Sequence, residues 1–218
     1  MTDITQTLPT HQVAEESSLE GLCRLIKNIT LMDIEKVLPA VVLSYDRLLN
    51  RAVVRPAISG IAARGQKIPK LPLVDIPVLS LHGGGIFLSF PIKEGDKGWL
   101  VACDRDISIF KQNLQDSSPN SYRKHCFNDA FFIPDKINTI NVSEDDKGAV
   151  VISTVSGSTK FALSETGIKL TGNTVINGNV KVSGTLNADG DVVGSGISLA
   201  SHTHSGVESG AANTGGPQ

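Results

Sequence analysis

Residues 168–200 read IKLTGNTVINGNVKVSGTLNADGDVVGSGISLA, an alternation of small or apolar residues with polar ones. Every even-numbered position in 168–196 is apolar, Gly or Thr. The odd-numbered positions in 167–195 are mainly Lys, Asn, Thr, Ser and Asp, and only Val175 and Val193 are apolar. A period of two is typical of strands that bury one face. The stretch therefore predicts β-structure with a narrow apolar face.

The alternation continues without a break across the turn signals of this stretch. These signals are Gly172-Asn173, Asn177-Gly178 and Asp189-Gly190. One chain cannot bury so narrow a face, but three copies wound about one axis can close a thin core, and inward glycines let the backbones approach that axis. We predict an intertwined homotrimeric β-helix over residues 148–200. The alternative is a monomeric β-solenoid.

A His-x-His pair follows this segment. His202 and His204 lie in Ser-His-Thr-His-Ser-Gly, ahead of a tail of small residues. In an extended chain their side chains point the same way, about 6.6 Å apart at roughly 3.3 Å per residue. In a monomer two solvated histidines are the simpler interpretation. On a threefold axis, the same pair becomes six imidazoles that converge on one point.

Six imidazoles form an octahedral nitrogen site. Imidazole suits iron, nickel, copper and zinc, and octahedral geometry disfavours tetrahedral zinc and tetragonal copper. We therefore favour Fe(II), one ion per trimer, bound by His202 and His204. Because protein ligands fill every position, the ion would be structural, a clamp on chain ends that would otherwise fray.

The N-terminal half follows a different pattern. Residues 1–16 are polar and unpatterned, and a helix is predicted from Ser17, which forms a capping box with Glu20. Its apolar residues recur at spacings of three and four, so the helix has one apolar face that needs a partner: Leu19, Leu22, Cys23, Ile26 and Ile29.

Five short apolar runs follow the helix, separated by Gly and Pro. They are AVVLSYD, RAVVRPAI, DIPVLSL, GIFLSF and GWLVACD, all within residues 36–110. This spacing predicts a small, partly open β-barrel of the OB type. Trp99 and Phe90 are predicted as core residues. Residues 111–147 are predicted as a connecting segment, and Glu144, Asp145 and Asp146 within it as a solvated turn rather than a calcium loop.

Composition narrows the classes of function. A net charge of −2 offers no basic surface for nucleic acid. No apolar run approaches the roughly 20 residues of a membrane span, and the start of the chain lacks the regions of a signal peptide, so we expect synthesis in the cytoplasm. Three cysteines without CxxC spacing argue against a disulfide scaffold. Gly83-Gly84-Gly85 lacks the Lys-Ser/Thr of a phosphate-binding loop, and no GxSxG motif occurs.

Several segments of the sequence resemble the central membrane-puncturing spikes of contractile phage tails. The segments that resemble their OB-fold domain are LPAVVLSYDRLLNRAVVRPAI, DIPVLSLHGGGIFLSFPIKEGDKGWLVACDRDI and RKHCFNDAFFIP, and the segment that resembles their iron-binding apex is SHTHSG. The resemblance covers about residues 36–215. It implies a virion protein at the tip of the tail baseplate, whose OB domain contacts baseplate hub or tail-tube proteins and whose needle contacts the bacterial outer membrane.

The predicted fold is thus mainly β. A tail and helix (1–35) precede an OB-fold β-barrel (36–110), a connecting segment (111–147), a trimeric β-helix (148–200) and a metal-clamped apex (201–218). We expect a mechanical protein and no enzyme: carboxylates such as Glu94, Asp96, Asp104 and Asp106 are predicted at turns of the barrel rim. The alternative is a trimeric tail-fibre or receptor-binding tip. No aromatic residue follows Phe161, which favours puncture over recognition.

Overall fold

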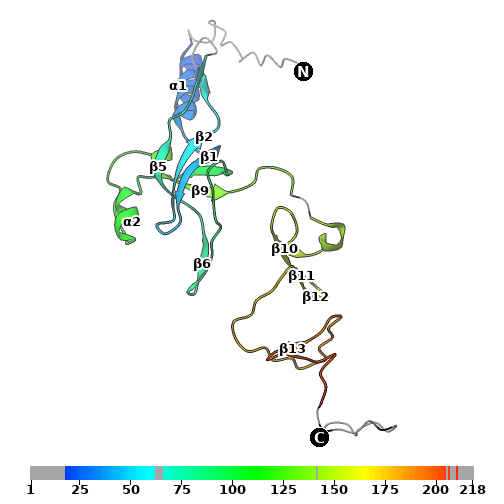
Figure 1. The fold of residues 1–218 in the computed structure, drawn as a ribbon. Coiled ribbons are helices and arrows are strands. Elements are labelled where there is room, and N and C mark those ends of the chain that lie inside the picture. The colour runs from blue at the N-terminus through cyan, green and yellow to red at the C-terminus, as the bar shows by residue number, and fades with distance from the viewer. Residues whose placement is uncertain (1–17, 62–65, 141, 205, 207–209, 211–218) are drawn as a thin grey trace. The chain divides into compact units, whose positions relative to one another are not determined.

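A computed structural model of the chain describes residues 18–61, 66–140, 142–204, 206 and 210 (Figure 1). It divides into two compact units, Met1–Asn141 and Val142–Gln218, which are considered separately below. In the described residues no helix has the length and apolar character needed to cross a bilayer. The predicted N-terminal tail, residues 1–16, lies outside the described residues.

The first unit begins with helix α1, Leu19–Asp33. Ser18 caps it, and its hydroxyl accepts a hydrogen bond of 3.0 Å from the Gly21 backbone N–H. The predicted cap, Ser17, lies outside the described residues. Glu20 pairs with Arg24 one turn later.

A five-stranded antiparallel sheet follows the helix. Its strands, in spatial order, are β5 (Leu73–Pro77), β2 (Arg51–Pro56), β1 (Val37–Asp46), β8 (Lys97–Ala102) and β9 (Ala130–Pro134). A parallel bridge joins Val78 to Phe132, and the Leu79 N–H donates to the Phe132 carbonyl at 2.8 Å. The two edge strands therefore meet, and the sheet curls into a barrel. The predictions of a mainly β chain and an OB-like domain are confirmed.

The fifth strand of the barrel is not the predicted one. The GIFLSF run was expected to lie in the sheet, but Ile86–Leu88 (β7) pairs with Leu81–Gly83 (β6) in a separate hairpin, labelled β6 in Figure 1. Its turn residues Gly84 and Gly85 both have positive φ, as a two-residue hairpin loop requires. Phe90 is 48% exposed, so its predicted core position is wrong.

β9 completes the barrel instead, although it lies within the predicted connecting segment, 111–147. The predicted boundary at residue 110 consequently falls inside the folded unit. The chain between β8 and β9 contains a short helix, α2 (Ser108–Asn113), and a single 3₁₀ turn, Phe127–Asp129. A second small hairpin, β3 (Gly60–Ile61) with β4 (Lys67–Ile68), lies between β2 and β5.

Phe132 lies at the centre of the barrel core and is fully buried. Gly98 faces it from β8: a Cβ atom at this position would lie 2.5 Å from the Phe132 ring and 2.2 Å from the Ile133 carbonyl oxygen. Only glycine permits this approach. The other buried apolar residues of the core are Ala40, Val42, Ala52, Val54, Ile76, Val78, Leu100, Phe127 and Ala130.

The second unit contains less regular structure. Strands β10 (Val150–Ser153), β11 (Lys160–Ser164) and β12 (Gly167–Thr171) form an antiparallel sheet, and β13 (Val193–Gly194) pairs with β14 (Ile197–Ser198). The single chain thus forms a local three-stranded sheet over the first part of the predicted β-helix. No strand occurs from 172 to 192, and those side chains are exposed. The trimeric β-helix stays a prediction.

Candidate metal centre

A hairpin carries the predicted metal ligands. Its turn residues Ser195 and Gly196 have φ values of 52° and 82°, the left-handed pair that a tight two-residue loop requires. Beyond β14 the ladder continues, because the Leu199 N–H donates to the Val192 carbonyl at 2.8 Å. The chain reaches His202 three residues later.

Asp191 holds the base of this hairpin. Its carboxylate accepts a hydrogen bond of 3.0 Å from the Ala200 backbone N–H. Hydrogen bonds from the Ser198 side chain and, next, from the Ala200 N–H lower the pKa of Asp191 below its ordinary value. The carboxylate is therefore ionised near neutral pH and joins both sides of the hairpin just before the histidines.

Backbone carbonyl groups orient the His202 ring. Its Nδ1 lies 2.9 Å from the Ser198 carbonyl oxygen and 3.2 Å from the Leu199 carbonyl oxygen. A carbonyl oxygen only accepts, so Nδ1 must carry the proton and donate it. In the neutral ring the lone pair then lies on Nε2, the arrangement in which a carbonyl partner prepares an imidazole to bind a metal.

His204 lies close to His202. The two ring centroids are 5.1 Å apart, with their planes inclined by 79°, and both side chains are exposed. The structure thus brings the two predicted ligands together. No group of three or more His, Cys, Asp or Glu side chains that could hold a metal ion occurs among the described residues. One chain consequently supplies two imidazoles and too few ligands to surround an ion.

Asp191 and Ser198 were missed by the sequence analysis. Asp191 occupies one of the outward positions of the alternation, where a carboxylate is unremarkable. The useful signal was the Ser195-Gly196 turn: a two-residue loop there places residue 191 opposite residue 200. From that register, a contact between Asp191 and the backbone just before the histidines could have been predicted.

The carboxylates of the barrel form a different kind of cluster. Asp106 and Asp129 are buried, and Arg123 contacts both of them at 3.0 Å. Hydrogen bonds from Ser108 and Ser121 lower the pKa of Asp106. The prediction of Asp106 as a turn residue of the rim is therefore wrong: it is buried and contacts Ser108, Ser121 and Arg123, and Arg123 in turn contacts Asp129 of the 3₁₀ turn before β9.

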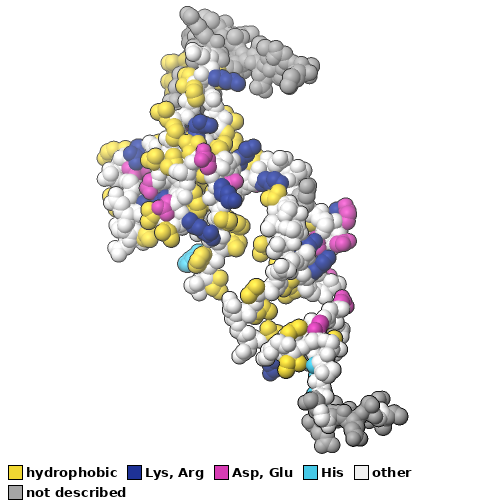
Figure 2. All heavy atoms as spheres, in the orientation of Figure 1, with side chains coloured by type: hydrophobic (Ala, Val, Ile, Leu, Met, Phe, Trp, Pro, Cys, Tyr) yellow, Lys and Arg dark blue, Asp and Glu magenta, His cyan; other side chains and the backbone are white. Residues whose placement is uncertain are grey.

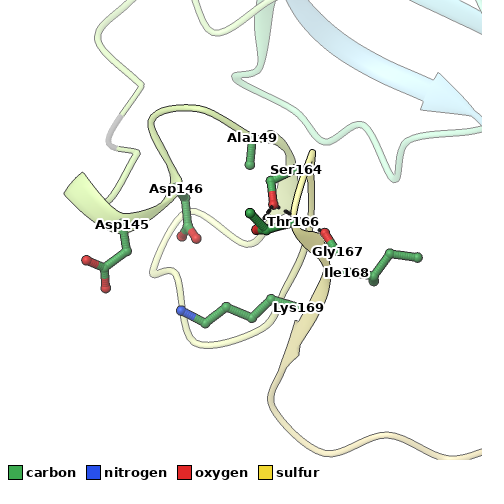
Figure 3. A pocket seen from close by; sticks show the side chains of 9 residues that line it. Asp145, Asp146, Ala149, Ser164, Thr166, Gly167, Ile168 and Lys169 are labelled. Carbon is green, nitrogen blue, oxygen red and sulfur yellow. Dashed lines mark hydrogen bonds between the residues drawn. The ribbon is translucent and has the colours of Figure 1, made fainter. Parts of the chain in front are cut away.

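A third acidic group lies at the start of the second unit. Glu144–Asp146 form a 3₁₀ turn in which Asp146 is buried, not solvated as predicted, and pairs with Lys160. The turn borders a hollow of about 230 Å³. Among the residues that line it, Asp145 points away from Ser164 and Thr166 (Figure 3). Glu144 pairs with Lys147 at 2.5 Å. Lys147 and Lys160 therefore neutralise Glu144 and Asp146, respectively.

Two segments of the chain match known protein families. Residues 38–135 match the family described as phage protein Gp138 N-terminal domain, and residues 196–218 match the GpV Apex motif. Both matches fit a phage tail spike protein. Among curated proteins none matches it significantly.

The limits of the two matches agree with the folded elements of this spike. The first match runs from the second residue of β1 to the residue after β9, so it covers the whole barrel and supports β9 as its last strand. The second match begins at Gly196, in the turn of the hairpin, and includes His202 and His204. A tail spike is a component of the virion.

Proposed function

We propose that three copies of the chain form the central spike of a contractile tail baseplate, which pierces the host outer membrane when the sheath contracts. The observation that carries the proposal is the apex hairpin. It presents His202 with its Nε2 lone pair free and His204 beside it, in a segment that matches a spike apex motif.

The three-stranded sheet of the second unit supports the trimer. Cross-strand pairing places two rows of apolar side chains on one face: Val150, Leu163 and Ile168 in one row, and Ile152, Phe161 and Leu170 in the other. Phe161 is half-buried, and the other five are 46–69% exposed. The opposite face carries Ala162, which is buried, and Lys160, which binds Asp146. So wide an apolar face calls for a partner.

The same argument extends along the rest of the predicted rod. Val180, Val182 and Leu186 occupy inward positions of the alternation and are 64%, 49% and 71% exposed in the single chain. Three chains about one axis would bury them together. The barrel would seat the spike on the baseplate hub or the tail tube, and the apex would meet the outer membrane.

The residues at the apex suit a structural iron. His202 and His204 offer imidazole nitrogens, and no thiolate or carboxylate joins them among the described residues. Three such pairs supply six nitrogen ligands, which fits one Fe(II) per trimer. When bound, the ion would tie three chain ends together. The role we propose is mechanical and not enzymatic, and it involves no nucleic acid.

The test combines the mass of the native protein with elemental analysis. We expect a trimer that contains about one iron per three chains, and loss of the metal when His202→Ala and His204→Ala are combined. Thr203→Ala, between the ligands, is the matched control and should keep the iron. Acid should release it, because protonated imidazole cannot bind a metal.

A phage that carries the double variant tests the mechanical role. It should assemble and adsorb but permeabilise the outer membrane poorly. A trimer that stays free of transition metal after anaerobic reconstitution with Fe(II) would contradict the proposed iron site and would not affect the proposed spike role. Labelling of the virion that places the protein away from the baseplate tip would overturn the spike role itself. Strong binding to host glycans would favour a receptor-binding tip instead.

A further inference from the structure

Helix α1 has an apolar face without a partner in the described residues. Leu19, Leu22 and Ile26 are 79%, 47% and 55% exposed, and hydrophobic side chains are visible along α1 in Figure 2. The half-buried positions of the helix, Gly21, Leu25 and Asn28, lie on a different face. The exposed apolar face is therefore free to pack against something else.

The spacing of this face is that of a coiled coil. Positions 19, 22, 26 and 29 are separated by three, four and three residues, the a and d positions of two heptads. Ile at both an a and a d position, as at 26 and 29, favours three strands over two. Among the b, c and f positions, Glu20, Arg24 and Lys27 are polar and exposed, Gly21 and Asn28 are half-buried, and Leu31 is 47% exposed.

Glu35 fixes how the chain leaves this helix. Its N–H donates to the His125 carbonyl at 3.0 Å. Its carboxylate accepts from the Phe127 N–H at 2.7 Å and pairs with Lys70. These contacts begin two residues after α1 ends at Asp33, so the end of the helix is held on the barrel. Three barrels around one axis would then present three helices in the same direction.

We propose that α1 from three chains packs as a short parallel three-stranded coiled coil through Leu19, Leu22 and Ile26. This inference rests on the proposed trimer and adds a second contact to it, on the N-terminal side of the barrel. Two heptads are too short to associate alone. Joined to a trimer, however, the helices share a high effective concentration, which makes a weak coiled coil sufficient.

Thiol cross-linking in the full-length chain tests the packing. In a Cys23→Ser background, Ile26→Cys places a thiol in the predicted seam, and Lys27→Cys places one on the outer surface. Native protein is treated with a short bis-maleimide and separated on a denaturing gel. We expect covalently linked chains for Ile26→Cys, at a yield independent of protein dilution, and the background yield for Lys27→Cys. The Cys23→Ser protein reports the contribution of the half-buried Cys103 and Cys126.

The native mass separates the possible outcomes. A trimer with no linkage through Ile26→Cys, or with equal linkage through Lys27→Cys, overturns the coiled coil and leaves the proposed spike intact; an apolar surface of another tail protein would then be the occupant. A monomer overturns the trimer itself and the coiled coil with it.

Hydrogen exchange of the α1 backbone amides tests the same helix packing without any cysteine cross-link. A lone 15-residue helix exchanges almost freely. We expect protected α1 amides in the parent trimer and in Arg24→Ala, and a loss of protection of tenfold or more in Leu22→Asp. Free exchange of α1 in the parent trimer would overturn the proposal.

Discussion

The barrel and the second unit of this chain bury their apolar residues in different ways. The barrel encloses Val42, Val54, Ile76, Leu100 and Phe132 at 0% exposure. In the described part of the second unit, Ala162 is the one buried apolar residue, and long apolar side chains such as Val182 stay exposed. Both segments are rich in short apolar runs, yet only one of them closes on itself.

The difference follows from how the strands meet. In the barrel the two edge strands of the sheet, β5 and β9, meet through the bridge between Val78, which follows β5, and Phe132. Every inward side chain therefore has a neighbour within the same chain. The β10–β12 sheet is open, and its apolar face has no second layer in the described chain. A barrel can therefore fold from one chain, whereas the described part of the second unit forms no such closed core, and the trimer we propose would supply one.

The largest effect, loss of the trimer, is expected from a charged side chain at an inward position of the predicted β-helix, residues 148–200. Val182→Asp would place three carboxylates near one axis, where unpaired burial of charge is prohibitive. We expect complete loss of the trimer, measured by light scattering, with the barrel still folded by circular dichroism. Lys181→Asp, one residue earlier and on the outward side, should leave the trimer intact. Equal behaviour of the two variants would show that the alternation does not mark a core.

The next effect concerns the barrel alone. Phe132→Ala removes a fully buried ring and should lower the free energy of unfolding of the barrel by about 3–5 kcal/mol. Trp99, the single tryptophan of the chain, lies on β8 opposite Ile133 and reports the transition by fluorescence. The control Phe87→Ala, at a position that is 68% exposed, should change little. Dissociation of the trimer by Phe132→Ala would contradict the independence of the two units.

A smaller loss of stability is expected when the close contact between β8 and β9 is disturbed. Gly98→Ala forces a methyl group against the Ile133 carbonyl and the Phe132 ring, and overpacking of this kind costs about 1–3 kcal/mol. Denaturant titration of the same fluorescence measures it. Gly148→Ala, where an added Cβ meets no atom within 4 Å, is the control. Unchanged stability in Gly98→Ala would mean that β9 is not held closely against β8.

The smallest expected effect depends on pH. Hydrogen bonds from Lys160 and Ser143 lower the pKa of Asp146 in the folded state. Its contribution to stability is therefore complete above the ordinary carboxyl pKa of about 3.9 and is lost as the pH falls through the lower folded value. Asp146→Asn should melt at a slightly lower temperature than the parent near pH 7 and at the same temperature in strong acid. Asp145→Asn, the control, should melt at the same temperature as the parent at every pH. A difference in melting temperature between Asp146→Asn and the parent that grows in acid would contradict the stabilising role of ionised Asp146.

Local sequence patterns predicted the fold class, the first helix and the neighbouring histidines of this chain. The apolar runs predicted a mainly β chain with an OB-like domain, and the spacing of Leu19, Leu22 and Ile26 predicted a helix with one apolar face. The His202-Thr203-His204 motif predicted two neighbouring imidazoles, and the ring centroids lie 5.1 Å apart, while the metal site itself stays a prediction. These features depend on residues close in sequence, so the sequence by itself determined them.

Only the tertiary structure decided which run completes the barrel and what holds the apex. GIFLSF and AFFIP are both rich in apolar residues, but it is β9 that pairs with β8 and also reaches Val78, a choice that depends on closure between strands far apart in the chain. Likewise, the proton on His202 Nδ1 depends on two carbonyl groups that the β13–β14 hairpin brings into position. Closure between strands far apart in the chain is a property of the folded chain, and no local pattern encodes it.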